Sequence, residues 1–130
     1  MENNKKIAVI DDEECIQTPL GLRLRKLGYQ VIQVMDGAQA IQTVRTQKPD
    51  LIILDLFLPH FSGEEICKAI REDEDESIAS IPIIMVTAKD STADRIVGKV
   101  IGANTYITKP FEFPELLKEI KHYLHADSDN

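Results

Sequence analysis

Residues 51–55 have the sequence LIILD, four apolar residues followed at once by an acid. A short apolar run that is rich in β-branched residues and has no polar interruption is typical of a strand buried on both faces of a parallel sheet. Similar short runs occur at residues 7–10, 31–34, 81–86 and, more weakly, 106–107. The sequence therefore predicts five strands, with 51–54 and 81–86 at the centre of the sheet.

Helical patterns separate these runs. Apolar residues recur three or four positions apart within 16–27, 38–44, 93–101 and 113–124, and less clearly within 63–72. Strands that alternate with single helices run parallel, with right-handed crossovers that place helices on both faces of the sheet. The sequence therefore predicts an α/β fold with a doubly wound parallel sheet of five strands in the order 2-1-3-4-5, whose edges are the second and fifth strands.

Two stretches leave alternatives open. Pro19 lies inside the first helical pattern, so either the helix kinks there or a new helix starts with Thr18 as its N-cap and Pro19 in its first turn. Residues 72–76 are five consecutive acids. They indicate a solvated loop or, as the alternative, a site for a cation or a protein partner.

Length and composition indicate one globular domain over residues 1–125, followed by a polar tail at 126–130. The net charge of -7 argues against direct nucleic-acid binding, and no apolar run approaches the roughly 18 residues of a membrane helix. Cys15 and Cys67 lie far apart with no Cys or His cluster beside them, which predicts free thiols and fits the reducing cytoplasm. The three histidines form no convincing ligand set: His60, His122 and His125.

Polar residues follow the strands at the points where four of them end. Asp11 and Asp12 follow the first strand, Asp55 the third, Thr87 the fourth and Lys109 the fifth. Ligands of open parallel sheets bind outside the carboxyl ends of the strands, so we expect these side chains to meet in one crevice. Each residue taken singly has a structural explanation, such as a helix cap, a strand-end hydroxyl or a surface lysine.

Three converging carboxylates require positive charge, because two of them about 4 Å apart repel by ~4 kcal/mol at an effective dielectric constant of ~20. Lys109 supplies one positive charge, and the hard oxygen ligands favour Mg²⁺ for the rest. Asp55 follows the most buried run, where a carboxylate can act as a nucleophile and form an aspartyl phosphate. Lys109 and Thr87 would then contact the phosphoryl oxygens.

These motifs together resemble the response-regulator receiver domain of two-component signalling, over residues 5–125. The motifs that carry the resemblance are IDDE at 10–13, LDLFLP at 54–59 with Gly63, VTA at 86–88, GA at 102–103 and YITKPF at 106–111. The resemblance implies a flavodoxin-like fold and a phosphorelay protein. Its phosphoacceptor would be Asp55, supplied by a histidine kinase or a phosphotransfer protein. The protein would catalyse only its own phosphorylation and slow dephosphorylation.

The resemblance also assigns roles to individual residues. Mg²⁺ would be held by Asp11, Asp12, Asp55 and the backbone carbonyl of Phe57. Thr87 and Lys109 would engage the phosphoryl group, Tyr106 would be the switch aromatic, and the Lys109–Pro110 bond would be cis. A changed surface near 93–101, 106–107 and 113–124 would signal to a downstream protein or to an output domain outside this chain.

Other functions fit the residues less well. A flavodoxin-like cofactor carrier needs a phosphate-binding loop after the first strand, where this chain has four acids at 11–14. A Mg²⁺-dependent phosphatase typically has a second acid two residues after the nucleophile, where Phe57 stands. A docking module without phosphorylation would lack the acids or the acceptor, and both are present. We expect Phe57 to restrict water near an acyl phosphate and to lengthen its lifetime.

Overall fold

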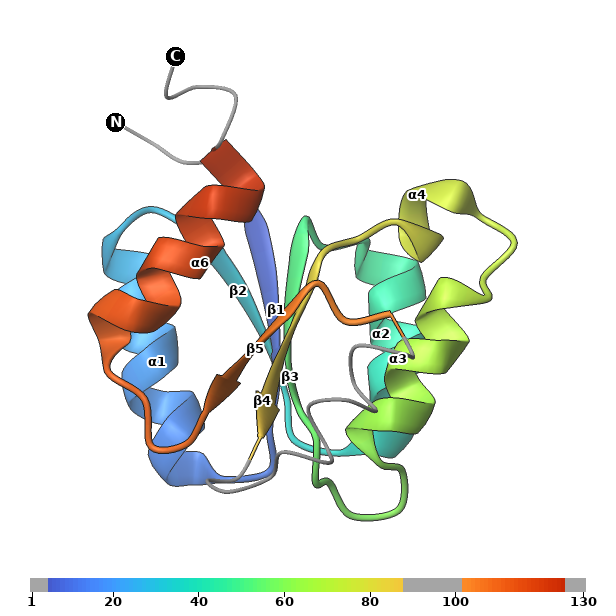
Figure 1. Ribbon diagram of the computed structural model, residues 1–130, viewed down its shortest axis with the longest axis horizontal. Coiled ribbons are helices and arrows are strands. Elements are labelled where there is room, and N and C mark those ends of the chain that lie inside the picture. The colour runs from blue at the N-terminus through green and yellow to red at the C-terminus, as the bar shows by residue number, and fades with distance from the viewer. Residues whose placement is uncertain (1–4, 88–101, 126–130) are drawn as a thin grey trace.

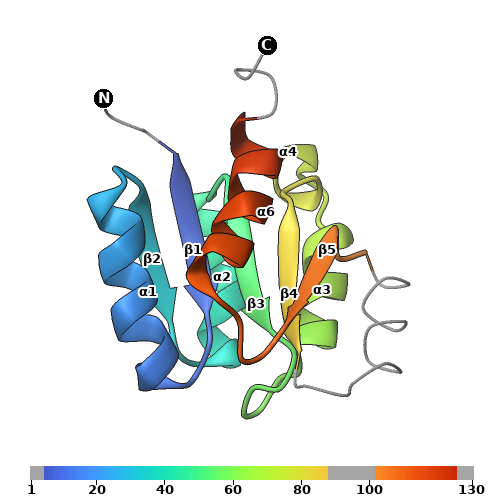
Figure 2. The same ribbon diagram turned by 60° about the vertical axis from the view of Figure 1, so that its left-hand side comes forward.

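The computed structural model describes residues 5–87 and 102–125, which contain one parallel sheet with the strand order β2-β1-β3-β4-β5. Figure 2 shows the strands in this order. The predicted order and both predicted edges are confirmed. The strands are β1 (Lys6–Ile10), β2 (Gln30–Val34), β3 (Leu51–Asp55), β4 (Ile83–Thr87) and β5 (Thr105–Thr108).

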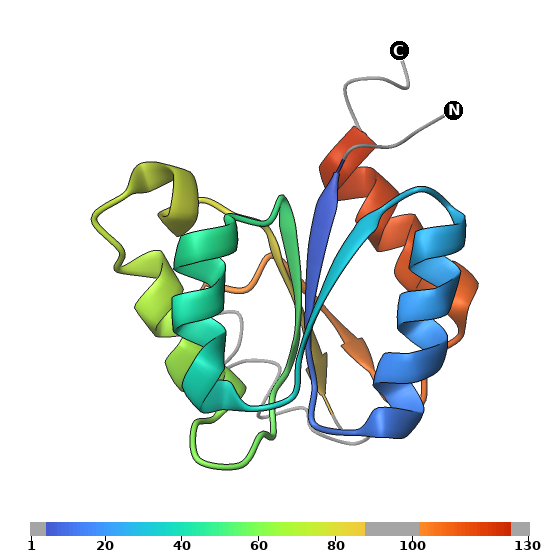
Figure 3. The same cartoon turned by 180° about the vertical axis from the view of Figure 1, so that it is seen from behind.

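Helices cover both faces of the sheet (Figures 1 and 3). One face carries α1 (Glu14–Lys26) and α6 (Phe113–His125), which lie side by side. The other face carries α2 (Gly37–Gln47), α3 (Gly63–Arg71) and the single-turn α4 (Glu76–Ala79). The helix predicted within 93–101 lies outside the described residues.

Each face has its own apolar core, which explains the uninterrupted strand sequences. In β3, Ile52 and Leu54 belong to the core under α2 and α3, whereas Leu51 and Ile53 belong to the core under α1 and α6. All five residues of β3 are buried, and so are all five of β4. Apolar side chains on both faces thus hold β3 in the centre of the molecule, and Asp55 is its last residue.

The prediction for the acidic run was incomplete, because a short helix begins inside it. Asp75 caps α4 by accepting a hydrogen bond from the backbone N–H of Ser77. The Asp73 carboxylate pairs with Arg45 of α2 at 2.7 Å. Two of the acids therefore fix local structure, whereas Glu72, Glu74 and Glu76 are exposed, as expected for a solvated loop.

The course of the first helix excludes one of the two alternatives that the sequence left open at Pro19. α1 begins at Glu14 and continues through Pro19 to Lys26, so no new helix starts at Thr18. Pro19 lies on the exposed side of α1, whereas Leu20 and Leu24 are buried against the sheet. Burial of the opposite helix face offsets the backbone hydrogen bond that a proline cannot donate.

Two smaller observations concern the cysteines and the lengths of the helices. Cys15 is exposed and Cys67 is buried, and neither forms a disulfide bond. No helix in the described part of the chain has the length and apolar character needed to cross a membrane.

Candidate metal and phosphoryl site

The carboxyl ends of β1, β3, β4 and β5 meet at the lower edge of the sheet in Figure 1. Asp11, Asp12 and Asp55 each offer a carboxylate oxygen there, and the three oxygens lie within 4.8 Å of one another. Lys109 follows β5, and its backbone N–H donates to the carbonyl of Thr87 at 2.7 Å. The structure thus brings together all five residues that the strand-end argument selected.

The two buried carboxylates are held by the same local arrangement. Asp11 Oδ1 accepts the N–H of Glu13 at 2.9 Å, and Asp55 Oδ1 accepts the N–H of Phe57 at 3.2 Å. Each acid thus bonds the backbone two residues ahead, a turn that is common for aspartate after a strand. The other oxygen of each acid faces Lys109, whose Nζ lies 3.1 Å from Asp11 Oδ2 and 3.3 Å from Asp55 Oδ2.

Glu13 is a further member of the site that the sequence did not identify. Its carboxylate also accepts a hydrogen bond from Lys109 Nζ, although half of the Glu13 side chain is exposed. The acidic stretch at 11–14 indicated an acid here, but its spacing did not show which acid would pair with a lysine 96 positions away.

The charges at the site shift the pKa values of its groups. Burial and the neighbouring Asp11 carboxylate raise the pKa of Asp55 from 3.8 to about 6, and Lys109 offsets only part of this effect. Burial also raises the pKa of Asp11, against the opposing N–H of Glu13 and the charge of Lys109. Burial alone would lower the pKa of Lys109, but its contacts with Glu13, Asp55 and Asp11 outweigh that effect and raise it.

The residues present fit a magnesium ion. Among the described residues the site combines four carboxylates with one ammonium, that of Lys109, which contacts three of them, and this leaves a surplus of negative charge. Mg²⁺ binds oxygen at about 2.1 Å, so two of its ligands lie at most about 4.2 Å apart. The spread of the three aspartate oxygens is therefore close to what one ion requires. Mg²⁺ also retains several waters, and the site has room for them next to the exposed Asp12.

A hollow of about 310 Å³ opens beside the acids and gives access to Asp55. Its walls include Asp12, Glu13, Phe57 and Lys109. The side chain of Phe57 is 55% exposed and forms part of the rim. The site is therefore open to a phosphoryl group carried by another molecule.

Gly63 explains how the chain brings α3 so close to the end of β3. Its N–H donates to the carbonyl of Leu56 at 2.7 Å. A Cβ at this position would lie 2.5 Å from the carbonyl oxygen of Asp55 and 2.8 Å from the Cα of Leu56. Only glycine permits this contact, so Gly63 fixes the turn that follows Asp55.

Thr87 and Tyr106 occupy neighbouring strands on the far side of Asp55. The Thr87 hydroxyl is buried and has no hydrogen-bond partner among the described residues. Tyr106 is half-buried, packs against the core beneath α3, and pairs in register with Met85 of β4. The Lys109–Pro110 peptide bond is cis, as the family resemblance implied.

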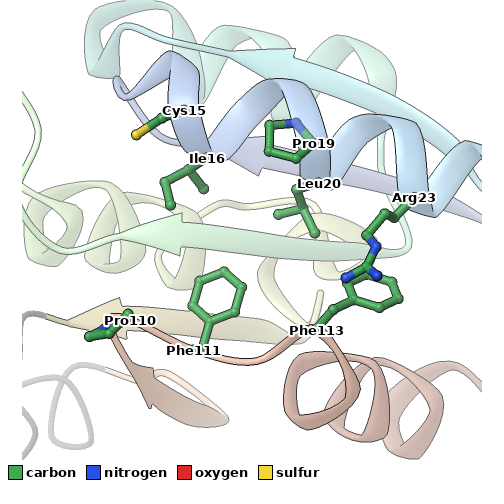
Figure 4. Close-up of a pocket in the computed structure, with 8 residues that line it drawn as sticks. All are labelled: Cys15, Ile16, Pro19, Leu20, Arg23, Pro110, Phe111 and Phe113. Atoms are coloured by element: carbon green, nitrogen blue, oxygen red, sulfur yellow. The ribbon is translucent and has the colours of Figure 1, made fainter.

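A second, more apolar hollow of about 200 Å³ lies next to the site, between α1 and the segment that leads into α6 (Figure 4). Ile16, Pro19 and Leu20 face Phe111 across it. At one end the Arg23 guanidinium stacks over the ring of Phe113, 4.6 Å from its centroid.

Comparison with known families bears directly on this geometry. The family model of the response regulator receiver domain matches residues 7–121. The chain belongs to this family. It is therefore a receiver domain of two-component signalling, and its sheet order 2-1-3-4-5 is the order that the pattern of strands and helices predicted.

Two curated relatives are response regulators. The chain is 45% identical over 121 residues to the alkaline phosphatase synthesis transcriptional regulatory protein PhoP of Bacillus subtilis, covering 93% of this chain and 49% of that protein. It is 39% identical to the sensory transduction protein RegX3 of Mycolicibacterium smegmatis, covering 95% of this chain and 52% of that protein. The chain thus spans about half the length of the curated relatives it matches.

Solved receiver domains have the same fold. The receiver domain of the sensor histidine kinase PA1611 from Pseudomonas aeruginosa PAO1 is 33% identical with a TM-score of 0.84, covering 94% of this chain and 98% of that one. That structure has a magnesium ion coordinated in its active-site cleft. The chemotaxis protein CheY4 of Vibrio cholerae is 30% identical with a TM-score of 0.85, covering 94% of this chain and 100% of that one.

Proposed function

We propose that this receiver domain is a phosphorylation switch in which Asp55 accepts a phosphoryl group from a phosphohistidine of a histidine kinase or phosphotransfer protein. The observation that carries the proposal is the position of Lys109 Nζ, within 3.3 Å of both Asp11 and Asp55, beside the exposed carboxylate of Asp12. This arrangement combines a nucleophile, a cation and a cluster of hard ligands in one open hollow.

The transfer itself requires little from the protein beyond positioning and charge. A carboxylate oxygen of Asp55 forms a bond to phosphorus, the bond from phosphorus to the donor imidazole nitrogen breaks, and that nitrogen keeps the electron pair. The product is an acyl phosphate on Asp55. The protein would catalyse this step and the slow hydrolysis of the acyl phosphate, and no other reaction.

Mg²⁺ would be held by Asp11, Asp12, Asp55 and the backbone carbonyl of Phe57. When bound, it would neutralise negative charge on the phosphoryl oxygens. Lys109 would exchange its contact with Asp55 for one with a phosphoryl oxygen. The Thr87 hydroxyl has no partner among the described residues, and it would donate its hydrogen bond to another phosphoryl oxygen.

The switch would spread through β4 and β5. Thr87 ends β4 opposite Thr108, and Tyr106 lies on β5 two residues earlier. Movement of Thr87 toward the phosphoryl group would leave space that Tyr106 enters. The surface formed by β5, α6 and the segment 93–101, which lies outside the described residues, would then differ between two populated states.

The signal would pass to a downstream protein or to an output domain outside this chain. PhoP is by its name a transcriptional regulator, and this chain matches only about half of the length of PhoP. Direct contact with nucleic acid would belong to an output domain, because the receiver itself has a net charge of -7. Two cysteines that form no disulfide bond fit a cytoplasmic location.

The proposal can be tested by incubating the protein with acetyl phosphate and Mg²⁺ and measuring the intact mass. We expect one base-labile phosphoryl adduct that is absent after chelation of Mg²⁺ and absent in Asp55→Asn. Asp36→Asn is the matched control, since Asp36 lies at the same edge of the sheet and asparagine also caps a helix. An adduct that persists in Asp55→Asn, or that forms equally without a divalent cation, would refute the proposal.

A further inference from the structure

We propose that Gln17 is a positioning residue of the acidic site. Its side-chain amide would hold the loop between β1 and α1 so that Asp11 and Asp12 present their carboxylates to one cation. This inference rests on the proposed magnesium site. It assigns the geometry of that site to a side chain that touches neither the ion nor the phosphoryl group.

The amide nitrogen of Gln17 contacts three backbone carbonyls at the carboxyl ends of β1 and β2. Nε2 lies 2.9 Å from the carbonyl oxygen of Val9 and 3.0 Å from those of Asp11 and Val34. The residue is only 3% exposed, so water does not compete for these contacts. Gln17 therefore connects the carboxyl ends of both strands to α1.

These contacts define the orientation of the amide. If the amide were turned over, its oxygen would face three carbonyl oxygens, which repel it. In the orientation observed, Oε1 is buried with no hydrogen-bond partner among the described residues. A buried acceptor without a partner lowers the stability of the fold. An apolar residue would avoid that cost but could not hold the carbonyls.

The connection to the metal ligands runs through the backbone of Asp11. The N–H of Asp11 donates directly to the Val34 carbonyl at 3.0 Å. The carbonyl of Asp11 is tied to the same Val34 oxygen through Gln17 Nε2. Both ends of the Asp11 residue are thus fixed against β2, and the peptide unit that leads to Asp12 is fixed with them.

The main chain of Gln17 is also held from β2. Gln33 Nε2 donates to the Gln17 carbonyl at 2.6 Å. Gly21, one turn further along α1, leaves room for this contact, because a Cβ there would lie 2.6 Å from Gln33 Nε2. Gln17 is therefore fixed through its main chain as well as its side chain, so its amide cannot easily follow a loop that moves.

The test measures Mg²⁺ affinity by isothermal titration calorimetry in Gln17→Met, which keeps the length of the side chain and removes its donors. We expect the affinity to fall tenfold or more, the range typical of residues that orient metal ligands. Val44→Ala is the control, because Val44 is buried in the last turns of α2, towards the opposite edge of the sheet. It should lose stability and keep its Mg²⁺ affinity.

Two further arms separate the possible failures. Wild type and Asp12→Asn test the metal site itself, which is refuted if the wild type binds no Mg²⁺ or if Asp12→Asn binds it equally well. If both behave as proposed while Gln17→Met binds within twofold of wild type, the positioning role is refuted. A Val44→Ala variant that loses as much affinity as Gln17→Met would refute it too.

Marginal folding of Gln17→Met does not prevent the measurement. Bound Mg²⁺ raises the free energy of unfolding by an amount set by its concentration and its dissociation constant. The shift of the urea midpoint between chelator and saturating Mg²⁺ therefore reports affinity even for a weakened variant. We expect a clear shift in wild type and Val44→Ala and a much smaller one in Gln17→Met. Equal shifts in all three would overturn the inference.

Discussion

Asp55, the proposed phosphoacceptor, lies in surroundings that disfavour its charged form. It is almost completely buried, 5% exposed, and lies near the Asp11 carboxylate, with Lys109 as a partner that it shares with two other acids. A charged group in this position is harder to keep ionised than one in water. The cost is tolerated because the same carboxylate has to be within reach of a metal and a phosphoryl group.

Replacing this acid therefore stabilises the metal-free protein. The folded state binds a proton at Asp55 with a pKa of about 6, whereas the unfolded chain does so near 3.8. Stability from this group is complete below the unfolded value and is lost as the pH rises through 6. We expect Asp55→Asn to be more stable than wild type by about 1–3 kcal/mol at pH 7.5.

The difference between the two proteins should shrink as the pH falls from 6 to 4, because wild-type Asp55 then becomes neutral as well. Urea unfolding in the presence of a chelator at both pH values measures it. Asp11 titrates in both proteins, so its contribution largely cancels. A less stable Asp55→Asn at pH 7.5 would show that the contact with Lys109 outweighs burial.

Phe57 provides a second residue-level prediction. Phe57 lines the hollow beside Asp55, where we expect its ring to limit the approach of water to an acyl phosphate. We expect Phe57→Asn to lose its phosphoryl group several-fold faster than wild type, measured by intact mass after acetyl phosphate is removed. Phe61→Asn is the control, since Phe61 is exposed in the same loop and does not line the hollow. Equal rates in wild type and Phe57→Asn would contradict the shielding role.

At the residue level, the sequence predicted the groups that follow strands but not the contacts between side chains. Asp11, Asp55 and Lys109 follow from the strand ends alone, because the carboxyl edge of a parallel sheet collects them. Glu13 and Gln17 could not be predicted in this way, because both lie on or beside a helix, where a side chain can point in many directions. Their partners are fixed only by the packing of α1 against the sheet.

At the scale of elements, the turn from β3 to α3 is the most constrained part of the site. Gly63 begins α3 in contact with the backbone of Asp55 and Leu56, and a capping box on Ser62 and Glu65 fixes the start of the helix. The helix buries one face, which carries Ile66, Cys67 and Ile70. Packing of this face holds the turn against the end of β3.

Gly63→Ala should therefore disturb both stability and phosphorylation. The added Cβ would overlap backbone atoms, which cannot move as a side chain can. We expect a loss of about 1–3 kcal/mol in urea unfolding, together with slower adduct formation. Gln42→Ala is the control, because Gln42 is an exposed residue of α2, and it should behave as wild type in both measurements. A Gly63→Ala protein as stable as wild type would show that the turn can relax.

Helices were predictable where apolar residues kept the helical spacing over a long stretch, and strands were predictable where they are fully buried. The single turn of α4 was missed because its helical signal is one capping aspartate within an acidic run. β4 begins at Ile83, two residues later than the apolar run, which includes Pro82. Pro19 was ambiguous because local propensity opposes a helix that the packing of Leu20 and Leu24 enforces.

At the scale of the whole molecule, the strand order brings distant residues together. β1 and β3 are neighbours, β4 and β5 follow, and Lys109 reaches across from the end of β5 to acids on β1 and β3. This one lysine therefore links the strand that carries Tyr106 to the strand that carries Asp55, the proposed phosphoacceptor. Loss of the lysine should separate phosphorylation from its conformational consequence.

We expect Lys109→Ala to accept phosphate from acetyl phosphate at a reduced level, without the change in β5 and α6 that follows phosphorylation in wild type. Hydrogen exchange of Thr105–Thr108 before and after phosphorylation measures this change. Lys118→Ala, an exposed lysine on α6, is the control and should behave as wild type. A normal exchange response in phosphorylated Lys109→Ala would contradict the role of the lysine.

The central claim is that distant acids surround a cation so that one aspartate carries the phosphoryl group. Its most direct test is to phosphorylate the protein, reduce the acyl phosphate with borohydride and sequence the peptides by mass spectrometry. Reduction converts a phosphorylated aspartate to homoserine. The account predicts homoserine at position 55 alone, and only when Mg²⁺ was present. Homoserine at position 11 or 12, or none at any position, would contradict it.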